Sequence, residues 1–256
     1  MGKGHRLAER RQAILATLEE AGQLSVATLS SRFDVSEVTI RQDLQALNEQ
    51  GLLLRTRGGA VASNVMPELS VELRQHQQAT QKARIGQAAA RLVNDGDTII
   101  LDASTTAQAI IPHLKHLTEL TVITNSLKTA LSFLDAPQIQ VILPGGTLRR
   151  AAISLVGQFD SEAIRDINVQ VGFFGARGLT LAEGLTDVDL QESRMKRAML
   201  QRCQKKVGVL DARKWGKVAA VTIAPLDQID TIISDADAPA GLVEQFRQHK
   251  IEVILV

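Results

Sequence analysis

The sequence predicts a protein of two folded parts, a small α+β part followed by a larger α/β part with a mostly parallel sheet. Residues 7–61 hold three helical segments with regularly spaced apolar residues and then a short hairpin pattern. From residue 98 onward, short apolar runs alternate with helical patterns, which is typical of strands buried on both faces of a parallel sheet. The length of 256 residues suits one small and one medium domain.

Composition narrows the class of protein. Hydrophobic residues make up 45% of the chain but aromatic residues only 3%, so the cores must be aliphatic. The single cysteine, Cys203, excludes an internal disulfide and suits a reducing cytoplasm. No apolar run reaches the roughly 18 residues of a membrane span. The charged N-terminus also lacks the apolar centre of a signal peptide. We therefore expect a cytoplasmic protein without a membrane segment.

The N-terminal part has the pattern of a helix-turn-helix. In residues 7–21 the apolar residues recur with a period of 3.6, and Gly22 ends the pattern. Ser25 is placed to cap a second predicted helix over 26–33. After a tight turn, a third helix is expected over 36–50. Helices in this order, with a tight turn between the second and third, predict a helix-turn-helix.

The third helix carries the residue types of a DNA-reading helix. Val38, Ile40 and Leu44 are expected to supply apolar contacts, which leaves the polar side chains to point elsewhere. Threonine, arginine and glutamine near a helix start can bring hydrogen-bond donors to base edges. The predicted DNA-contacting residues of this helix are Ser36, Glu37, Thr39, Arg41 and Gln42.

Two short β stretches around residues 58–59 predict a hairpin wing after this helix. Arg55 and Arg57 lie two residues apart, so on a strand they face the same side and suit phosphates or a minor groove. A further basic cluster near the N-terminus consists of Lys3, Arg6, Arg10 and Arg11. The whole chain has a net charge of only +1, whereas phosphate contacts supply much of DNA affinity. Tight binding should therefore need two or more such basic faces.

Residues 7–61 resemble the winged helix-turn-helix of the DeoR family of bacterial sugar-metabolism regulators. The matching residues are 11–15, 35–44, Gly51 and 55–60. Family members usually carry a second basic residue where Gln42 stands, a departure expected to affect the operator that is read and not the mode of binding. The resemblance implies a homodimer or homotetramer on operator DNA with an inverted or direct repeat. Arg41 is the expected base contact.

Residues 62–80 mix polar residues with Pro67 and lack a sustained apolar period. They are expected to link a DNA-binding domain over 1–61 to a second domain over 81–256. Strands of the second domain are predicted at 98–103, 120–124, 139–143, 171–176, 206–211, 219–224, 230–235 and 251–256. Helices are predicted at 81–93, 106–116, 126–134, 160–167, 188–205 and 239–248.

Polar residues stand at the carboxyl ends of these strands, where parallel sheets bind ligands. Residues 102–106 and 124–126 each lead from a strand into a helix, where hydroxyls and free N–H groups can bind an anion. After the third strand, Gly145 and Gly146 would let the backbone approach a ligand closely. Any one of these features is commonly only a cap or a turn. Their recurrence at three or four strand ends predicts a binding site.

Residues 80–235 are similar to the effector domain of DeoR-type regulators, which is related to ribose-5-phosphate isomerase and binds phosphorylated sugars. The matches are Asp102 with 105–106, then 124–126, 145–149, 184–186, Glu192 with 196–199, and Asp211 with Lys214 and Gly216. The resemblance implies a phosphorylated sugar as effector and no cofactor. The effector-binding residues expected on this basis are Asp102, Ser104, Thr105, Thr106, Asn125, Ser126, Gly145, Gly146, Arg149, Arg177, Lys196 and Lys214.

Three loop residues depart from the family pattern. Ser104 stands where the family usually has glycine, and Arg213 where it usually has serine. Arg177 stands where the family usually has aspartate, so a cation replaces an acceptor of sugar hydroxyls. We hypothesise that the effector is more anionic than a simple sugar monophosphate. The competing interpretation is a surface arginine paired with Asp187 or Asp189.

The predicted function is a transcriptional regulator, a repressor of sugar-metabolism genes that is relieved by a phosphorylated sugar. One alternative is an isomerase-type enzyme with a DNA-binding appendage, which would need a general base near the substrate. Glu192 and Asp187 are the candidates for that base. The other alternative is a sugar-phosphate-binding protein without specific DNA binding. The five histidines show no metal-ligand spacing, so no metal is expected. A regulator needs no catalytic residue, and none is expected.

Overall fold

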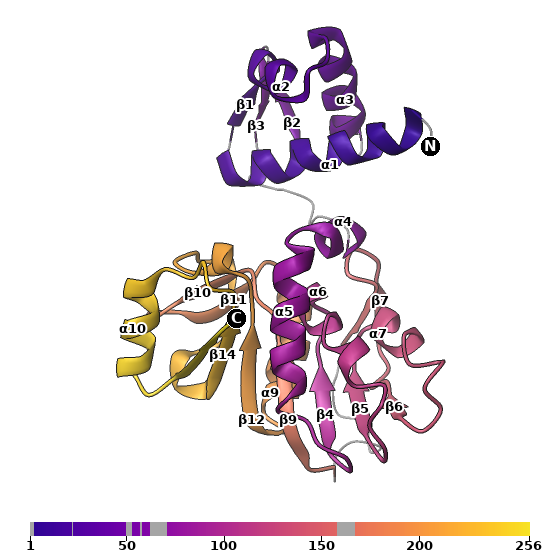
Figure 1. Cartoon of the computed structure of the whole chain (residues 1–256), viewed down its shortest axis with the longest axis vertical. Coiled ribbons are helices and arrows are strands. Elements are labelled where there is room, and N and C mark those ends of the chain that lie inside the picture. Colours follow the sequence, from indigo (N-terminus) through magenta and orange to yellow (C-terminus); the bar gives the residue numbers. More distant parts are fainter. Residues whose placement is uncertain (1–2, 22, 50–52, 57, 62–70, 158–166) are drawn as a thin grey trace. The chain divides into compact units, whose positions relative to one another are not determined.

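The structure is a computed structural model, and it describes all residues except 1–2, 22, 50–52, 57, 62–70 and 158–166. The chain divides into two compact units, residues 1–73 and 74–256 (Figure 1). One apolar core lies in the first unit and two lie in the second. Among the described residues, no helix is both long and apolar enough to cross a membrane.

The N-terminal unit packs three helices against a small antiparallel sheet of order β1-β3-β2. Its helices are α1 (Lys3–Ala21), α2 (Val26–Phe33) and α3 (Glu37–Glu49). Its strands are β1 (Gln23–Ser25), β2 (Leu54–Thr56) and β3 (Gly59–Val61). Ile14, Leu29, Ile40 and Leu44 are fully buried between the helices. The predicted helix-turn-helix and wing are therefore confirmed.

Local chemistry places the turn between α2 and α3. The Ser25 hydroxyl accepts a hydrogen bond from the Thr28 N–H at 3.0 Å, and Ser36 accepts one from Thr39 at 3.2 Å. Both predicted N-caps are thus made. Asp34 takes a φ of 50°, the left-handed conformation that commonly ends a helix.

The wing is closed by a third strand, β1, which the sequence pattern does not predict. In β1, Leu24 pairs with Ala60 of β3. A Cβ at Gly59 would lie 1.9 Å from the Leu24 carbonyl oxygen, so this strand contact requires a glycine there. Three residues are too few for an alternating pattern to be recognised, which explains why β1 was missed.

A buried carboxylate ties α3 to α1. The Asp43 side chain is only 1% exposed, and its two oxygens accept hydrogen bonds from Arg10 Nε at 2.6 Å and Arg11 Nε at 2.9 Å. Such charge-assisted bonds are stronger than neutral ones. Two of the four N-terminal cations that we expected to face DNA therefore have a structural partner inside the unit.

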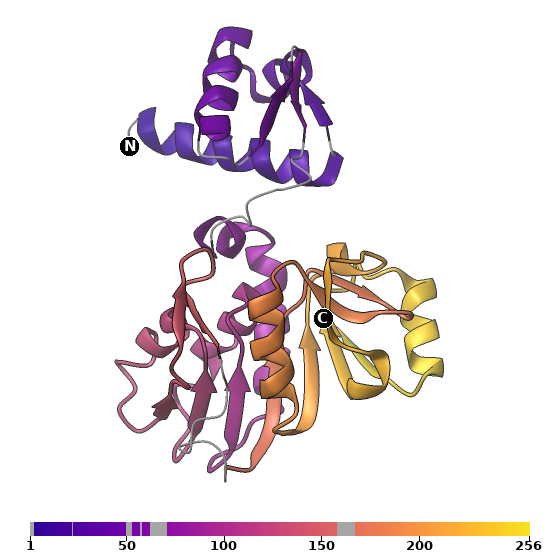
Figure 2. The ribbon, with the colours of Figure 1, turned by 180° about the vertical axis from the view of Figure 1, so that it is seen from behind.

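A seven-stranded parallel sheet of order β15-β14-β12-β9-β4-β5-β6 forms the centre of the C-terminal unit (Figure 2). Its strands are β4 (Thr98–Leu101), β5 (Thr121–Thr124), β6 (Gln140–Ile142), β9 (Val169–Phe174), β12 (Cys203–Val209), β14 (Thr231–Ser234) and β15 (Glu252–Leu255). This sheet confirms the predicted α/β class.

Two smaller sheets accompany the large one. A hairpin pairs β7 (Thr147–Arg149) with β8 (Ser154–Val156), and an antiparallel sheet joins β10 (Gly178–Thr180), β11 (Gly184–Asp187) and β13 (Val221–Ala224). The strand predicted over 219–224 therefore exists but belongs to this antiparallel sheet.

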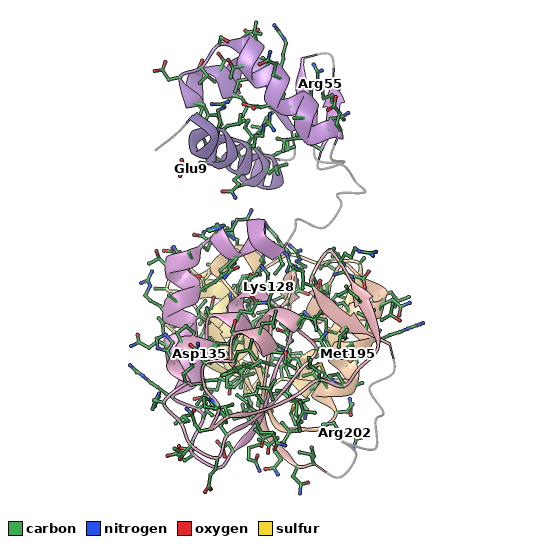
Figure 3. All side chains as sticks on the ribbon, turned by 90° about the vertical axis from the view of Figure 1, so that its right-hand side faces the viewer. Glu9, Arg55, Lys128, Asp135, Met195 and Arg202 are labelled. Atoms are coloured by element: carbon green, nitrogen blue, oxygen red, sulfur yellow. The ribbon has the colours of Figure 1, made fainter. Side chains whose placement is uncertain are left out.

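Helices cover both faces of the large sheet, with α5 on one face and α9 on the other (Figures 1 and 2). Along β4, Ile99 and Leu101 enter the core with α5, whereas Ile100 enters the core that contains Met195 of α9 (Figure 3). The helices are α4 (Val71–His76), α5 (Ala79–Ala90), α6 (Thr105–Gln108), α7 (Leu127–Leu131), α9 (Leu190–Leu200) and α10 (Ala240–Gln248). The short 3₁₀ turns are η1 (Ile111–His113), η2 (Ala212–Lys214) and η3 (Leu226–Gln228).

Some predicted boundaries were wrong. The helix predicted over 188–205 ends at Leu200, because β12 begins at Cys203 with polar residues that read as a helix face. The helix predicted over 106–116 is split into α6 and η1, and Pro112 falls within the second piece.

Part of the predicted linker is helical. Within 62–80, residues 71–76 form α4 and Ala79 begins α5, while 62–70 lie outside the described residues. The helix predicted over 160–167 also falls almost wholly outside the described residues.

We expect Asp43→Asn to destabilise the N-terminal unit by about 1–3 kcal/mol, because it leaves Arg10 and Arg11 without their shared carboxylate. Chemical denaturation of the full chain, followed by a probe of the N-terminal unit, measures this. Glu37→Gln is the matched control, because it breaks the exposed pair with Arg41 and should cost under about 1 kcal/mol. Equal effects of the two substitutions would contradict the structural role given to Asp43.

Candidate functional site

The exposed face of α3 carries the predicted DNA-contacting residues. Ser36, Glu37, Arg41 and Gln42 are exposed and Thr39 is half-buried. Arg41 forms an ion pair with Glu37 at 2.6 Å, one helical turn away. This pair aligns the guanidinium along the outer face of the helix.

One residue of α3 does not lie where the sequence reading placed it. Val38 was expected to pack inward, but it is 60% exposed. At 100° per residue it falls opposite the buried positions Ile40, Leu44 and Leu47. The apolar side chain by itself suggests burial, whereas the helical period places the residue on the exposed face.

The wing places a second arginine beside α3. Arg55 of β2 donates from Nη1 to Gln45 Oε1 at 2.7 Å, and its backbone N–H donates to Asn48 Oδ1 at 3.1 Å (Figure 3). Both partners lie on α3, so wing and helix present one continuous polar surface. Arg57, predicted to act with Arg55, lies outside the described residues.

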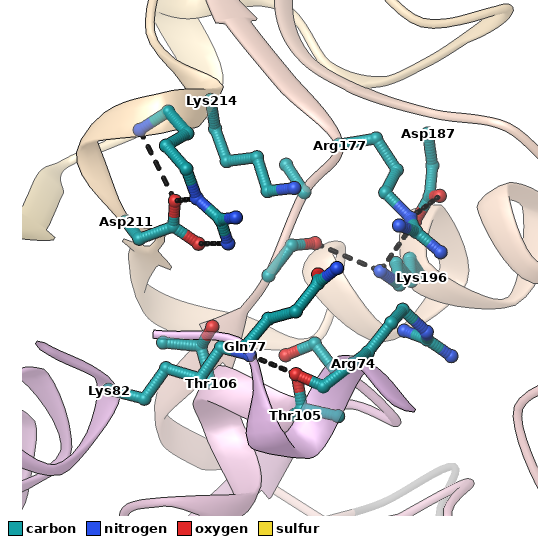
Figure 4. A pocket seen from close by; sticks show the side chains of 14 residues that line it. Arg74, Gln77, Lys82, Thr105, Thr106, Arg177, Asp187, Lys196, Asp211 and Lys214 are labelled. Atoms are coloured by element: carbon teal, nitrogen blue, oxygen red, sulfur yellow. Dashed lines mark hydrogen bonds and ion pairs between the residues drawn. The ribbon is translucent and has the colours of Figure 1, made fainter. Parts of the chain in front are cut away.

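A polar pocket lies at the carboxyl ends of β4, β9 and β12 in the C-terminal unit (Figure 4). From β4 the chain continues to β5 and β6 in one direction, whereas β9 is followed by β12, β14 and β15 in the other. The pocket is therefore at the point where the strand order reverses, the usual ligand position in such sheets. It is lined by Arg74, Gln77, Lys82, Ser104, Thr105, Thr106, Gly175, Ala176, Arg177, Asp187, Lys196, Asp211, Arg213 and Lys214.

A buried ammonium organises the pocket wall. Lys196 Nζ lies 2.8 Å from Asp187 Oδ2 and 3.0 Å from Asp102 Oδ2, and it donates to the Gly175 carbonyl oxygen at 2.9 Å. Burial alone would lower the pKa of Lys196, but the two carboxylates outweigh it and the net shift is upward. Burial alone would raise the pKa of Asp187, but the charge and hydrogen bond of Lys196, the charge of Arg177 and the Val188 N–H together outweigh it, and the net shift is downward. All three donors of the ammonium are thus used within the protein.

Backbone groups complete this cluster. The Gly175 N–H donates to Asp102 Oδ2 at 2.9 Å, and the Ser104 N–H donates to Asp102 Oδ1 at 2.9 Å. A Cβ at Gly175 would lie 2.3 Å from Ser104 Oγ, so the loop after β9 approaches the loop after β4 only because Gly175 has no side chain. Ser104 Oγ caps α6 by accepting from Ala107.

Six cationic side chains and two carboxylates line the pocket, so its wall carries an excess of positive charge. Figure 4 shows Lys214, Arg177, Lys196, Lys82 and Arg74 extending from different elements toward the same space. Thr105 and Thr106 add hydroxyls close to the cations, each with a residue exposure of 7%.

The charged forms of two of these cations, Lys82 and Arg74, are destabilised in the folded chain. Burial, together with the nearby cations Lys214, Arg213 and Arg74, lowers the pKa of Lys82 to about 7 against the opposing effect of Asp211. Burial and the charge of Arg177 lower the pKa of Arg74 to about 10. Lys82 Nζ also donates a hydrogen bond to the Arg74 carbonyl oxygen. A bound anion would relieve this mutual repulsion.

Arg177 stands in the pocket wall, with a side chain that is 14% exposed. Its Nε lies 4.0 Å from Asp187 Oδ1. The position of Arg177 is compatible with contact to an anionic effector, because the residue lines the pocket. It is also compatible with a structural pair, because Asp187 is one of its two suggested carboxylate partners.

Several predicted effector-binding residues do not line this pocket. Asn125 Nδ2 donates to Glu192 Oε1 at 3.2 Å, Ser154 Oγ donates to Glu192 Oε2 at 2.7 Å, and Arg149 Nη1 lies 3.7 Å from the same oxygen. Ser126 caps α7 by accepting from the Thr129 N–H. These side chains fasten the β7–β8 hairpin to the sheet and to α9.

The two glycines after β6 have a similar explanation. Gly145 and Gly146 have φ values of 82° and 117°, which favour glycine. A Cβ at Gly146 would lie 2.5 Å from the Val156 carbonyl oxygen. In this structure the close approach is to the neighbouring strand of the hairpin, and not to the pocket.

Eight lining residues were missing from the predicted effector-binding set: Arg74, Gln77, Lys82, Gly175, Ala176, Asp187, Asp211 and Arg213. Arg74 and Gln77 fell in the expected linker. A signal was available for Lys82, because its spacing places it on the inward face of α5 with Ile85 and Ala89. A lysine on an otherwise apolar helix face marks a buried charge with a partner or a ligand.

Known proteins resemble this chain along nearly its whole length. A DeoR-like helix-turn-helix domain matches residues 10–65, and a DeoR C-terminal sensor domain matches residues 77–236. The transcriptional regulator GolR of Listeria innocua is 36% identical, over 96% of this chain and 97% of its own. The glycerol-3-phosphate regulon repressor of Escherichia coli is 30% identical, over 96% and 98%.

A D-ribose-5-phosphate isomerase solved in complex with phospho-erythronic acid is similar in structure, with a TM-score of 0.41 and 15% identity over 54% of each chain. That likeness is too distant to indicate an activity. The sensor-domain match alone spans more than half of the 256 residues. With the exposed reading helix and full-length relatives that are named regulators, it follows that the chain belongs to the DeoR family of helix-turn-helix transcriptional regulators.

Proposed function

We propose that the chain represses genes of sugar or sugar-derivative metabolism, and that a phosphorylated sugar in the pocket releases it from operator DNA. The observation that carries this proposal is the lining of the pocket, in which six cations surround two carboxylates and two threonine hydroxyls. Cations suit phosphate oxygens. Carboxylates accept hydrogen bonds from sugar hydroxyls. A ligand that combines anionic and hydroxyl groups fits both.

The cations divide into two kinds in this proposal. Lys196 is saturated by Asp102, Asp187 and the Gly175 carbonyl, so its role is to position the wall. Arg74 and Lys82 have lowered pKa values, so an anion stabilises their charged forms and gains affinity in return. The name of one relative, the glycerol-3-phosphate regulon repressor, supports a small phosphorylated polyol as the class of ligand.

In this proposal, ligand binding in the pocket acts on the DNA-binding domain through α4. This helix includes the last residues of the N-terminal unit and the first of the C-terminal unit. Arg74 contributes its side chain to the pocket wall and its carbonyl oxygen to Lys82. A ligand that binds Arg74 and Lys82 more tightly in one position of α4 than in another shifts the chain toward that position.

The isomerase alternative has little support in this geometry. Asp187 is bound to Lys196 and has a lowered pKa, which makes it a weak base. Glu192 accepts hydrogen bonds from Asn125 and Ser154 and does not line the pocket. We therefore propose ligand sensing without catalysis. A homodimer or homotetramer is proposed as well, because a two-fold operator is read by paired copies of α3.

Gel-shift titration of the full chain on DNA upstream of its own gene tests the DNA-reading role. Arg41→Ala should weaken specific binding roughly 5- to 150-fold, the cost of losing one bidentate base contact. Arg194→Ala removes an exposed arginine of α9 and should leave binding unchanged. Salt concentration must be held constant, because it sets the non-specific background. Equal operator affinity of the Arg41→Ala variant and the unaltered chain would refute base reading by Arg41.

The same assay with a panel of sugar phosphates tests the charge of the effector. If Arg177 contacts a second anionic group, bisphosphates or sugar-acid phosphates should release the chain at lower concentrations than monophosphates. Arg177→Ala should abolish that preference, with Arg194→Ala again as the control. A preference for neutral-ended monophosphates that survives Arg177→Ala would show that the residue only pairs with Asp187.

Anion binding should take up a proton at Lys82. Its pKa in the folded chain is about 7, and an anion raises it by favouring the ammonium. Affinity should therefore be highest below pH 7 and decline as the pH rises from 7 to 9. Calorimetry with sulfate in buffers of different ionisation enthalpy measures the uptake, because sulfate itself does not titrate in this range.

Lys82→Met should flatten this pH profile and remove the proton uptake. Lys217→Met is the matched control, because Lys217 is an exposed lysine that does not line the pocket. A pH dependence that persists in Lys82→Met would assign the titration to another group.

A further inference from the structure

We infer that Val38 is a base-reading residue of α3 and that it contacts the 5-methyl group of a thymine in the operator. The inference deepens the DNA-reading function proposed above and rests on it. No pattern in the sequence pointed to this role, since the residue was expected in the core.

Val38 lies at the centre of the exposed face of α3. The buried side of the helix is defined by Ile40, Leu44 and Leu47, each at most 2% exposed. Val38 falls opposite them at the helical period, and its residue exposure is 60%. Because it sits in the first turn after the Ser36 cap, it belongs to the part of a recognition helix that contacts base edges.

Folding does not explain a valine at this position. An exposed valine buries little apolar surface, and its branched Cβ makes it a poorer helix former than alanine. Stability therefore favours almost any unbranched residue there. Val38 lowers the stability of the free helix and lies at the centre of the face that meets DNA. This combination indicates a contact that exists only in the complex.

The neighbouring polar side chains are occupied before DNA arrives. Arg41 is paired with Glu37 at 2.6 Å, and Gln45 bonds both Arg55 and Glu49. Val38 is exposed on the same face of α3, beside these groups. The Val38 side chain has neither a hydrogen-bond donor nor an acceptor, so it cannot recognise the hydrogen-bonding pattern of a base. Thymine is the one standard base that offers an apolar group, its 5-methyl, in the major groove.

Gln42 sits one turn after Val38 on the same face, at the i+4 position, and it is exposed. Glutamine reads adenine through N6 and N7. The pair Val38 and Gln42 therefore predicts a half-site with a thymine and an adenine at neighbouring positions. Arg41, on the flank of this face, would read a guanine beside them.

The test begins with selection of bound sequences from random duplexes by the full chain at fixed salt. Each thymine of the selected half-site is then replaced singly by deoxyuridine, which removes only the methyl group. Burial of one methyl gives about a fourfold change in affinity. We expect one thymine at which deoxyuridine weakens the unaltered chain by about that factor. Val38→Ala should bind the thymine duplex more weakly and show no further loss with deoxyuridine at that position.

Val218→Ala is the matched control, because Val218 is a valine of the C-terminal unit with 63% exposure. It should retain both the affinity and the deoxyuridine effect. Thermal unfolding should show that Val38→Ala is at least as stable as the unaltered chain, which separates lost contact from lost fold.

The outcomes distinguish this inference from the function on which it rests. If the unaltered chain selects no sequence, sequence-specific DNA reading itself fails. If a sequence is selected but Val38→Ala keeps the full affinity or the same deoxyuridine sensitivity, Val38 does not read a methyl group and the inference is overturned.

Discussion

The pocket depends on one buried ammonium between two carboxylates. Lys196 joins Asp102 at the end of β4 to Asp187 at the end of β11, and its third donor holds the loop after β9 through Gly175. Without the ammonium, two buried carboxylates would face each other, an arrangement that the fold could not keep ionised. Since this charge is neutralised internally, the excess positive charge available to a ligand comes from the cations around it. One ion cluster thus sets both the shape of the pocket and its preference for anions.

The N-terminal unit likewise contains both charged residues with a structural role and charged residues available to a ligand. Asp43 lies inside the run of residues that resembles a DNA-reading helix, yet it is buried and binds Arg10 and Arg11. The reading residues around it are exposed. In both units, the charged residues within the family motifs have two roles. The buried ones position helices and strands, and the exposed ones are available to contact the ligand.

Much of the fold was predictable, because the strand runs and helical periods are long and strongly apolar. The site was predictable where it follows a parallel strand directly, as at Ser104 and Arg177. The site was not predictable where tertiary contacts determine which side chains line the pocket. Arg74 comes from a segment without an apolar period, and the Asn125 side chain bonds Glu192 and does not line the pocket. Val38 shows the converse error, because residue type alone suggested burial while the helical period indicated exposure.

The pairing of Asp43 with two arginines also affects how association with DNA responds to ionic strength. Each phosphate that a protein neutralises contributes about −0.9 to the slope of log affinity against log salt. Arg10 and Arg11 are held by Asp43, and Arg41 is shared with Glu37, so these three described arginines displace fewer counterions than arginines without a carboxylate partner would. Pairing of this kind makes the salt dependence of DNA binding shallower than the number of arginines suggests, and it leaves a larger share of the affinity to contacts in the groove.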